Sequence, residues 1–556
     1  MIHLSIYHLK EGEIMKKTNR FIAIVLTLVM CLALLAACQP ADPGGNVTPT
    51  PGPATTGPSP TPGPPTPPAP PPAGANLAPF VDVIIRTGVA ILDPFIPAGS
   101  NAPTFQHINM FQDRLLNNRG DGTVEPQLAT RWETDDYQTF IFYLREDVYF
   151  HNGDHFTAAD VVWTVTEAQE AAGIVRTVWG SVEEVEALDT YTVRMTLESV
   201  NVDFPMVITH PAGGFYNERA MTNNRDTGIH VGTGPFKVVG FVSGDHTEFE
   251  RNYDYWGELP PTERVIIRFV PEGSARTIML MNRESHVTDA IITEDLPMFR
   301  DHSDYTVEQL VVNNPWFMAF NMAHPIAGDR NFRMAVAHAL YRPDIALYAV
   351  GAEGGPELSG TFWGNTMEFR ANDIPLIPRD LDLARNYLAA SVWNGETIEI
   401  VASLPTQVRA MEIVQLQMAE IGIPVEVRQM DNAGLNALMA HSPTQPAGHT
   451  IVLHTSSVAS LASDIRVNIH STAVNNRAGY MNPEIDRLLD LAITQGNPAE
   501  REATYRQIQY ILAEDIPFLN LYAEYRSIVA IKGVSGATFG DIVNWSWRGV
   551  YWNLDA

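Results

Sequence analysis

Apolar side chains alternate with polar ones, or run together for several residues, in a series of stretches beyond residue 80. Val, Ile, Phe and Tyr dominate these stretches, a composition typical of strands that are buried on at least one face. The segments with this pattern are 81–86, 139–144, 148–150, 265–270, 425–427 and 518–522. Only polar residues separate 139–144 from 148–150, so we expect these two strands to form a hairpin.

A second pattern spaces apolar residues three or four positions apart and predicts amphipathic helices between the strands. Segments 407–421 and 500–514 have this spacing, and Gly422 ends the first of them. Thr157 and Asp160 have the spacing of a capping box, so we expect a helix to begin directly after Thr157. Strands that alternate with helices predict an α/β fold in which helices cover the sheets.

The length of the chain and its charge restrict the fold and the function. The 556 residues exceed the roughly 250–300 that one hydrophobic core holds, so we expect at least two lobes. The 36 basic and 64 acidic residues give a net charge of −28. This balance argues against nucleic acid as a partner, because neutralising phosphates requires a basic surface. Two cysteines are too few for a disulfide framework or a Cys-rich metal site.

The N-terminal segment has the pattern of an export signal. Lys16, Lys17 and Arg20 precede the apolar stretch 21–37. The end of this stretch, Leu-Ala-Ala followed by Cys38, resembles the lipobox at which bacterial lipoproteins are lipidated and cleaved. We therefore expect 1–37 to be a signal peptide and Cys38 to carry the lipid. The alternative is a permanent membrane-spanning helix, because an apolar stretch of this length could just cross a bilayer.

Residues 38–75 have the composition of a tether. Fifteen prolines lie between Pro40 and Pro72, together with Thr, Gly and Ala and a single charge, Asp42. Such a stretch cannot bury a core and favours extended polyproline geometry. At about 3.1 Å per residue it could hold a domain roughly 100 Å from a membrane.

The chain lacks the common catalytic motifs. It contains no phosphate-binding loop, no Gly-x-Ser-x-Gly and no His-Glu-x-x-His. His151, Asp154 and His155 lie close together and could hold a metal, but a structural role in the turn at Asn152-Gly153 is the stronger interpretation. We expect a protein that is not an enzyme and needs no cofactor. A secreted hydrolase is the alternative from another class, and it would need a nucleophile or a pair of carboxylates.

Six blocks of sequence, in order along the chain, carry a family resemblance. They lie within 128–162, 232–257, 268–276, 320–339, 415–423 and 480–517. Together they resemble the family 5 extracellular solute-binding proteins, the lipoproteins that deliver peptides and related solutes to ABC importers. The resemblance covers roughly residues 80–530.

The resemblance implies a two-lobe fold of the periplasmic-binding-protein type (class II, family 5 type) with an inserted small domain. Two crossing strands would join the lobes, and the solute would lie between them. Lobe I would comprise 76–110, 212–271 and 526–556, the insert 111–211, and lobe II 272–525. We expect a monomer.

The resemblance also implies function and site. We expect an extracytoplasmic, lipid-anchored protein that binds a small solute, most simply a peptide, and works with the permease and ATPase subunits of an ABC importer. An oligosaccharide, an opine, or a metal or haem complex remains an alternative solute. The residues expected to contact the solute are Phe95, Ala98, Ser100, Thr233, Trp363 and Asp464.

Two of these residues have a competing interpretation. In family members that bind peptides, an aspartate of lobe II holds the α-ammonium, in a stretch that usually reads aromatic-Pro-Asp-Pro. Here the corresponding stretch has Asp464 as its only acid, without a proline or an aromatic residue beside it, so a surface role in a turn is the alternative. Trp363 stands in a loop rich in glycine and could cover a solute or pack in the core.

Overall fold

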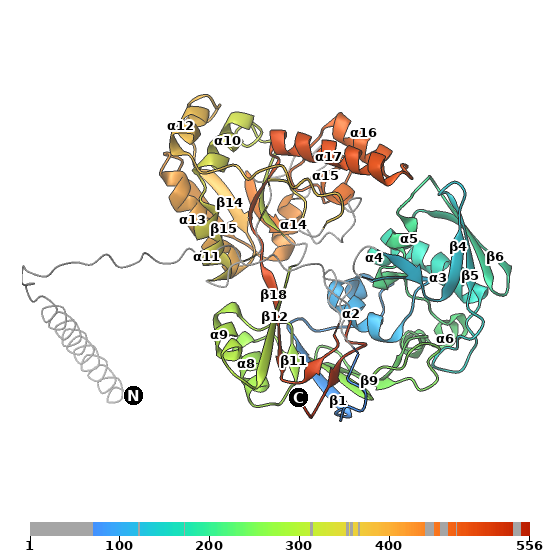
Figure 1. Ribbon diagram of the computed structural model, residues 1–556. Helices are drawn as coiled ribbons and strands as arrows, with labels where there is room; N and C mark the ends of the chain where they lie inside the picture. The colour runs from blue at the N-terminus through green and yellow to red at the C-terminus, as the bar shows by residue number, and fades with distance from the viewer. Residues whose placement is uncertain are drawn as a thin grey trace, which may run out of the picture. The chain divides into compact units, whose positions relative to one another are not determined.

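The computed structural model describes the chain from residue 70 onward, with short internal gaps (Figure 1). The described ranges are 70–119, 123–171, 173–311, 315–351, 355, 358, 360–364, 367–439, 450–455, 465–473, 475–537 and 546–556. They belong to one of the two units into which the chain divides, Thr61–Ala556. Within these ranges no helix has both the length and the apolar character needed to cross a membrane.

The first large sheet has seven strands in the order β12-β18-β11-β1-β10-β9-β8. They are β1 (Phe80–Ile85), β8 (Phe236–Val242), β9 (His246–Arg251), β10 (Arg264–Phe269), β11 (Val287–Thr288), β12 (Tyr305–Val311) and β18 (Tyr525–Ile531). The central strand β1 pairs in parallel with β10 and β11, and the outer pairs are antiparallel. Five of its six residues are buried, as expected for a strand covered on both faces.

Segments packed around this sheet complete lobe I. The helices are α2 (Ala102–Phe111), α6 (Glu218–Asn223), α7 (Arg225–Gly228), α8 (Gly273–Met281) and α9 (Leu296–Arg300). Short 3-10 turns are η1 (Pro97–Gly99), η2 (Pro211–Gly213) and η3 (Thr293–Asp295). Near the C-terminus, β19 (Val534–Ser535) pairs with β20 (Tyr551–Trp552).

A separate antiparallel sheet lies within residues 111–211, the expected insert, in the order β4-β5-β7-β6. Its elements are β4 (Ala129–Glu133), β5 (Thr139–Leu144), β6 (Val182–Asp189), β7 (Thr192–Leu197), α3 (Ala158–Glu170), α4 (Ile174–Trp179) and α5 (Phe204–Val207). The pair β2 (Leu116–Asn118) and β3 (Val124–Pro126) precedes it. Helix α3 begins as the capping box predicts, because Asp160 Oδ2 accepts the Thr157 N–H at 3.1 Å.

The predicted hairpin of 139–144 with 148–150 is wrong. Strand β5 has the predicted bounds, but β4 and β7 occupy its two edges. Segment 148–150 instead closes a tight turn, in which Tyr149 bridges His155 and Gly153 has a φ of 86°. The three polar residues at 145–147 lead the chain out of the sheet and do not return it along β5.

Lobe II is built on a five-stranded sheet in the order β15-β14-β16-β13-β17. Its strands are β13 (Trp316–Phe320), β14 (Ile398–Ala402), β15 (Val425–Gln429), β16 (Ile451–Thr455) and β17 (Phe518–Tyr522). Its helices are α10 (Arg330–Ala339), α11 (Arg342–Val350), α12 (Leu381–Ala389), α13 (Pro405–Ala419), α14 (Asn432–Met439), α15 (Arg466–Ile469), α16 (Pro483–Ala492) and α17 (Pro498–Asp515).

Alternate residues of β13 face two different cores. Met318 and Phe320 join the cluster formed with α10 to α13. Phe317 and Ala319 join the cluster formed with α14, α16 and α17. The sheet is therefore covered on both faces (Figure 1), which explains why every residue of β13 is buried.

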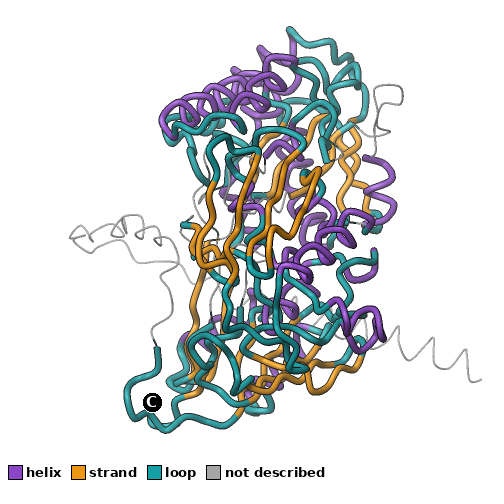
Figure 2. The backbone as a smooth tube through the Cα atoms, turned by 90° about the vertical axis from the view of Figure 1, so that its right-hand side faces the viewer, coloured by secondary structure: helices purple, strands orange, loops and turns teal. Residues whose placement is uncertain are grey.

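Two antiparallel crossings join the lobes. Strand β12 of the first sheet is followed by β13 of the second, and β17 of the second by β18 of the first. The strands pair with each other on both sides, β12 with β18 and β13 with β17. Figure 2 shows the strands of the chain in orange, among helices and loops. The paired crossings confirm the expected two-lobe α/β fold.

The strand pairing shifts the expected lobe boundary. We expected lobe II to begin at residue 272, but β11 and β12 pair with β1 and β18 of the first sheet. Residues 273–311 therefore belong to lobe I, and lobe II begins beyond the crossing, at β13. The expected boundary followed from the family resemblance, and the pairing of β11 and β12 with β1 and β18 depends on contacts between distant segments.

A buried ion pair connects the C-terminal segment to the start of the insert. Arg548 Nη1 lies 2.7 Å from Asp113 Oδ1, and the Asp113 side chain has no exposed surface. The same carboxylate accepts hydrogen bonds from Gln127, Thr233 and Trp256. One buried charge thus holds together five segments that are distant in sequence.

We predict that Arg548→Leu lowers the free energy of unfolding by about 3–5 kcal/mol, because it leaves the Asp113 carboxylate buried without its cation. Urea denaturation measures this loss. Arg219→Leu is the matched control: its partner is Asp154, but its own side chain is 68% exposed, so a change within about 1 kcal/mol is expected. Equal losses in the two variants would contradict the prediction.

Candidate functional site

The junction between the lobes is held by side chains on each side of the crossing. The Trp316 ring stacks on Tyr522 with centroids 6.1 Å apart, and its Nε1 donates to Glu524 at 3.3 Å. On the lobe I side, Arg526 Nη2 donates to the buried carboxylate of Asp289 at 2.7 Å. These contacts hold β13 against β17 in lobe II and β18 against the segment that follows β11 in lobe I, on either side of the turn that connects β17 to β18.

The loop that carries Phe95 and Ala98 was predicted to contact the solute. Phe95 is buried, with its ring edge-on to Tyr216 at 5.1 Å and beneath the Arg225 guanidinium at 5.2 Å. Ala98 is exposed, and its carbonyl accepts from the Asn101 side chain at 2.8 Å. Phe95 therefore anchors the loop and Ala98 faces solvent; contact of either with a solute stays a prediction.

Ser100, the third predicted residue of this region, connects lobe I to the insert. Its Oγ accepts the backbone N–H of Ile174, the first residue of α4, at 2.8 Å. Gly173 lies so close that a Cβ there would be 2.2 Å from this Oγ. The hydroxyl has a structural partner in this state, and its role in solute binding stays a prediction.

Thr233 lies in a turn where two backbone segments meet. A Cβ at Gly232 would lie 1.9 Å from the Phe111 carbonyl oxygen, and one at Gly234 would lie 2.6 Å from the Phe111 carbonyl carbon. Both glycines are therefore required, as the sequence indicates. Thr233 is fully buried and its Oγ1 donates to Asp113 at 3.3 Å.

His151 supports this same turn. Its Nδ1 accepts the Gly232 N–H at 3.2 Å, so the proton of the neutral ring is on Nε2, which donates to the Gly234 carbonyl at 2.9 Å. Burial lowers the pKa of His151 to about 4. Both nitrogens are occupied by backbone, as the structural interpretation of this histidine requires.

The neighbouring Asp154 and His155 also have structural partners. Asp154 pairs with Arg219, and His155 Nε2 lies 2.9 Å from the Glu146 carbonyl while its Nδ1 lies 3.2 Å from the Tyr191 hydroxyl. Across the described ranges, no group of three or more His, Cys, Asp and Glu side chains is placed to hold a metal ion.

Trp363 packs inside lobe II. It is 1% exposed, and its ring lies 6.3 Å from that of Tyr505. The preceding Phe362 stacks on Phe518 at 4.4 Å and meets Phe317 edge-on at 4.8 Å. This placement matches the packing alternative for Trp363, and its contact with a solute stays a prediction.

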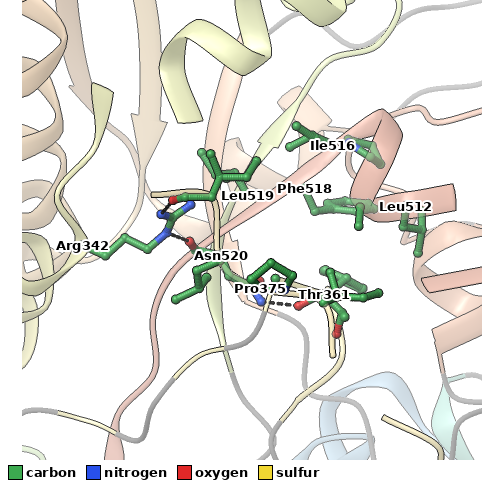
Figure 3. A pocket seen from close by; sticks show the side chains of 15 residues that line it. Arg342, Thr361, Pro375, Leu512, Ile516, Phe518, Leu519 and Asn520 are labelled. Atoms are coloured by element: carbon green, nitrogen blue, oxygen red, sulfur yellow. Dashed lines mark hydrogen bonds between the residues drawn. The ribbon is translucent and has the colours of Figure 1, made fainter. Parts of the chain in front are cut away.

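A cavity of about 120 Å³ lies beside this loop, between β17 and the first turn of α11 (Figure 3). Arg342 points into it, donating from Nε to the Asn520 carbonyl at 2.7 Å and from Nη1 to the Ile377 carbonyl at 2.8 Å. Burial lowers the pKa of Arg342 to about 10, so the group stays charged. Thr361 and Leu512 line the opposite wall.

The volume of this cavity limits what it can hold. It fits several water molecules and is smaller than the roughly 300–1,000 Å³ of pockets that enclose a drug-sized ligand. The cavity can therefore accept water or one polar group of a solute, but not a whole peptide.

Two predicted residues, Asp464 and Cys38, lie outside the described ranges. Conversely, the structure places Arg342 in a cavity lined largely by apolar residues, and pairs Asp203 of the insert with Arg501 of lobe II; sequence analysis missed both. Pro343 indicates a helix start after Arg342, but no local pattern indicates that these side chains are buried.

Comparison with protein families identifies one match. Residues 123–455 match the model of bacterial extracellular solute-binding proteins, family 5 Middle. The matched region begins in the insert and ends with β16, so it includes elements of both lobes.

The proteins that are similar to the chain include the following three. The peptide transport periplasmic protein SapA of Haemophilus influenzae is 24% identical over 386 residues, which are 65% of this chain and 67% of that protein. The periplasmic binding protein DppA of Helicobacter pylori, solved in complex with peptide STSA, superposes with a TM-score of 0.72 at 20% identity, covering 85% of this chain and 98% of that one. NikA of Brucella suis, solved in complex with Fe(III)-EDTA, gives 0.72 at 21% identity, covering 84% and 100%.

We predict that His151 contributes to acid sensitivity. Its folded pKa of about 4 lies below the ordinary value of about 6.5, so the unfolded chain binds the proton first and stability falls as the pH drops from about 6.5 to about 4. At pH 5 the loss due to this residue is about 2 kcal/mol. His151→Gln keeps a hydrogen-bond acceptor and a donor for the turn. Between pH 7 and pH 5, its free energy of unfolding, measured by urea denaturation, should therefore fall by about 2 kcal/mol less than that of the unmodified protein. The same pH dependence in both proteins would contradict the prediction.

Proposed function

The chain belongs to the family 5 bacterial extracellular solute-binding proteins, and on this basis we propose that it captures peptides outside the cytoplasm and delivers them to an ABC importer. Proteins of this family are substrate-binding components of ABC transporters and not enzymes. The chain is therefore a binding protein for peptides or related solutes, and the alternative of a secreted hydrolase is set aside.

One observation carries the proposal: the family match spans elements of both lobes, and among the described residues the two sheets are joined through the paired strands β12–β18 and β13–β17. Two bodies joined in this way can close on a solute that contacts both, and the solute then shifts the population toward the closed state. SapA, named for peptide transport, and DppA, solved with a peptide, favour a peptide as that solute.

A metal complex is the second candidate solute, because NikA, with the same fold, was solved with Fe(III)-EDTA. Oligosaccharides and opines complete the alternatives. For each of these solutes, the residues proposed to contact it are Phe95, Ala98, Ser100, Thr233, Trp363 and Asp464.

We further propose that the protein is a lipoprotein held at the outer face of a membrane as a monomer. Cleavage before Cys38 and lipidation of its sulfur would leave the proline-rich segment as a spacer. The spacer would allow the binding unit to reach the permease and ATPase assembly while one end stays anchored.

Peptides should stabilise the protein and sugars or Fe(III)-EDTA should not. A ligand that binds only the folded chain, present at a hundred times its dissociation constant, raises stability by about 2.7 kcal/mol, which thermal shift detects. Small-angle scattering with the same peptide should show compaction. If a sugar or a chelate binds and peptides cause no shift, the proposal of a peptide ligand is wrong and that solute takes its place.

Two variations of this experiment test how a peptide is held. If Asp464 meets the α-ammonium, Asp464→Asn should weaken binding by about 2–5 kcal/mol, and N-acetylated peptides should bind equally poorly to the unmodified protein. Unchanged calorimetric titrations in both cases would remove Asp464 from the site without affecting the peptide proposal.

Cys38→Ala should abolish lipidation and leave unprocessed or shed protein. The reason is chemical, because alanine offers no sulfur to acylate. Metabolic labelling with a palmitate analogue measures the outcome, and Cys31→Ala, within the same segment, is the matched control that should keep its label. Equal labelling of Cys38→Ala and the unmodified protein would refute the assignment.

A further inference from the structure

The insert touches lobe II at a point separate from the crossing strands. The backbone N–H of Val202 donates to the carbonyl of Ile493 at 3.0 Å, and Asp203 forms an ion pair with Arg501. Val202 and Asp203 directly precede α5, whereas Ile493 follows α16 and Arg501 lies in the first turn of α17 (Figure 1).

This contact is buried although it joins two different bodies. The Asp203 side chain is 4% exposed and that of Arg501 is 12% exposed. The Arg501 guanidinium also lies over the rings of Phe369 at 5.6 Å and Tyr505 at 5.8 Å. Gly496 completes the contact, because a Cβ there would lie 3.0 Å from the Tyr137 ring of the insert.

The insert shares a hydrophobic core with lobe I, so we infer that the two move together. Its buried residues, such as Phe142 and Val161, belong to the same hydrophobic cluster as Val83 of the first sheet, whereas lobe II has clusters of its own. Opening the lobes about the crossing strands would therefore separate Asp203 from Arg501.

Another ion pair between the lobes differs in character. Arg409 of α13 lies 3.8 Å from Glu294 of η3, and these side chains are 49% and 65% exposed. Exposed pairs of this kind contribute little to an equilibrium. The Asp203–Arg501 pair is desolvated, so its formation depends strongly on whether the lobes meet.

The buried contact is not fully paired. Among the described residues, the second oxygen of Asp203 and the Nε of Arg501 are buried without a hydrogen-bond partner. Closing removes both from water, which opposes the gain from the ion pair and the Val202–Ile493 hydrogen bond. When the cost of desolvation nearly cancels the gain from the ion pair and the hydrogen bond, the contact can open while both lobes stay folded.

We propose that Val202, Asp203, Ile493, Gly496 and Arg501 form a reversible latch that holds the insert against lobe II and sets how often the lobes close without solute. The latch gives the inserted domain a role in conformational control. The apparent affinity of a protein that closes on its solute depends on the fraction of molecules already in the conformation that binds. A stronger or weaker latch changes this fraction, and it therefore changes the affinity for every solute. The inference goes beyond the proposed function and does not depend on which solute is bound.

The Val202 amide reports the state of the latch directly, because its hydrogen bond crosses the contact. Hydrogen exchange of the full chain, measured without solute at residue resolution, should show Val202 protected, but less than Ile84 in the buried centre of β1. Asp203→Asn removes the charge, and Gly496→Leu places a side chain against Tyr137. Each should speed exchange at Val202 by at least about tenfold and leave Ile84 unchanged.

Asp82→Asn is the matched control, because Asp82 is an equally buried carboxylate that pairs with Arg268 at 2.6 Å inside lobe I. It should leave exchange at Val202 within about twofold of the unmodified protein. The double variant Asp203→Asn/Arg501→Gln should exchange no faster than Asp203→Asn alone, as expected when both side chains act through one pair.

Two results would overturn the latch. If Val202 in the unmodified protein exchanges as slowly as Ile84, the contact opens only on unfolding and is a fixed interface. If neither Asp203→Asn nor Gly496→Leu changes exchange at Val202, the contact does not control opening. Neither result bears on peptide binding, which thermal shift tests separately.

Discussion

The two chain crossings between the lobes constrain everything else in the fold. Strands β12 and β18 pair inside the first sheet, and β13 and β17 pair inside the second, so the connection between two large bodies is a ribbon two strands wide. Such a ribbon resists separation but bends more easily than a packed core. The stacking of Trp316 on Tyr522 holds the lobe II side of this connection, and the Arg526–Asp289 pair holds its lobe I side.

Within each lobe, buried arginines hold together segments that are distant in sequence. Arg548 joins the C-terminus to Asp113, Arg333 donates to the Asp515 carbonyl at the end of α17, and Arg342 connects α11 to β17. The planar guanidinium offers several donors in a fixed geometry, so one side chain can satisfy carbonyls on different loops. Rigid lobes built in this way confine motion to the crossing and to surfaces where the lobes meet.

Local patterns predicted much of the secondary structure because the forces involved are local. The periodicity at 407–421 predicted α13 to within two residues of its observed bounds, Pro405–Ala419. The capping box at Thr157 predicted the start of α3, and segment 518–522 has the bounds of β17. The hairpin at 148–150 and the boundary at 272 failed, since strand partners depend on contacts that no local pattern encodes. The candidate site was less predictable, because the blocks that carry the family resemblance supply much of the scaffold, such as the turn on Phe111 and the Asn482 cap of α16.

At the contact between the insert and lobe II, the free energy gained on closing is partly offset by the cost of removing polar atoms from water. A solute-binding protein gains affinity when its closed state is populated in advance, but a closed state that is too stable would admit and release solute slowly. A buried ion pair with complete hydrogen bonding would favour closure more than one whose remaining polar atoms lose water without gaining a partner. Here the Asp203–Arg501 pair is desolvated, yet one oxygen and one nitrogen lack partners among the described residues, so part of the gain is cancelled. The incomplete hydrogen bonding is therefore the feature that lets a buried contact between rigid lobes remain reversible, leaving the solute to supply the remaining free energy of closure.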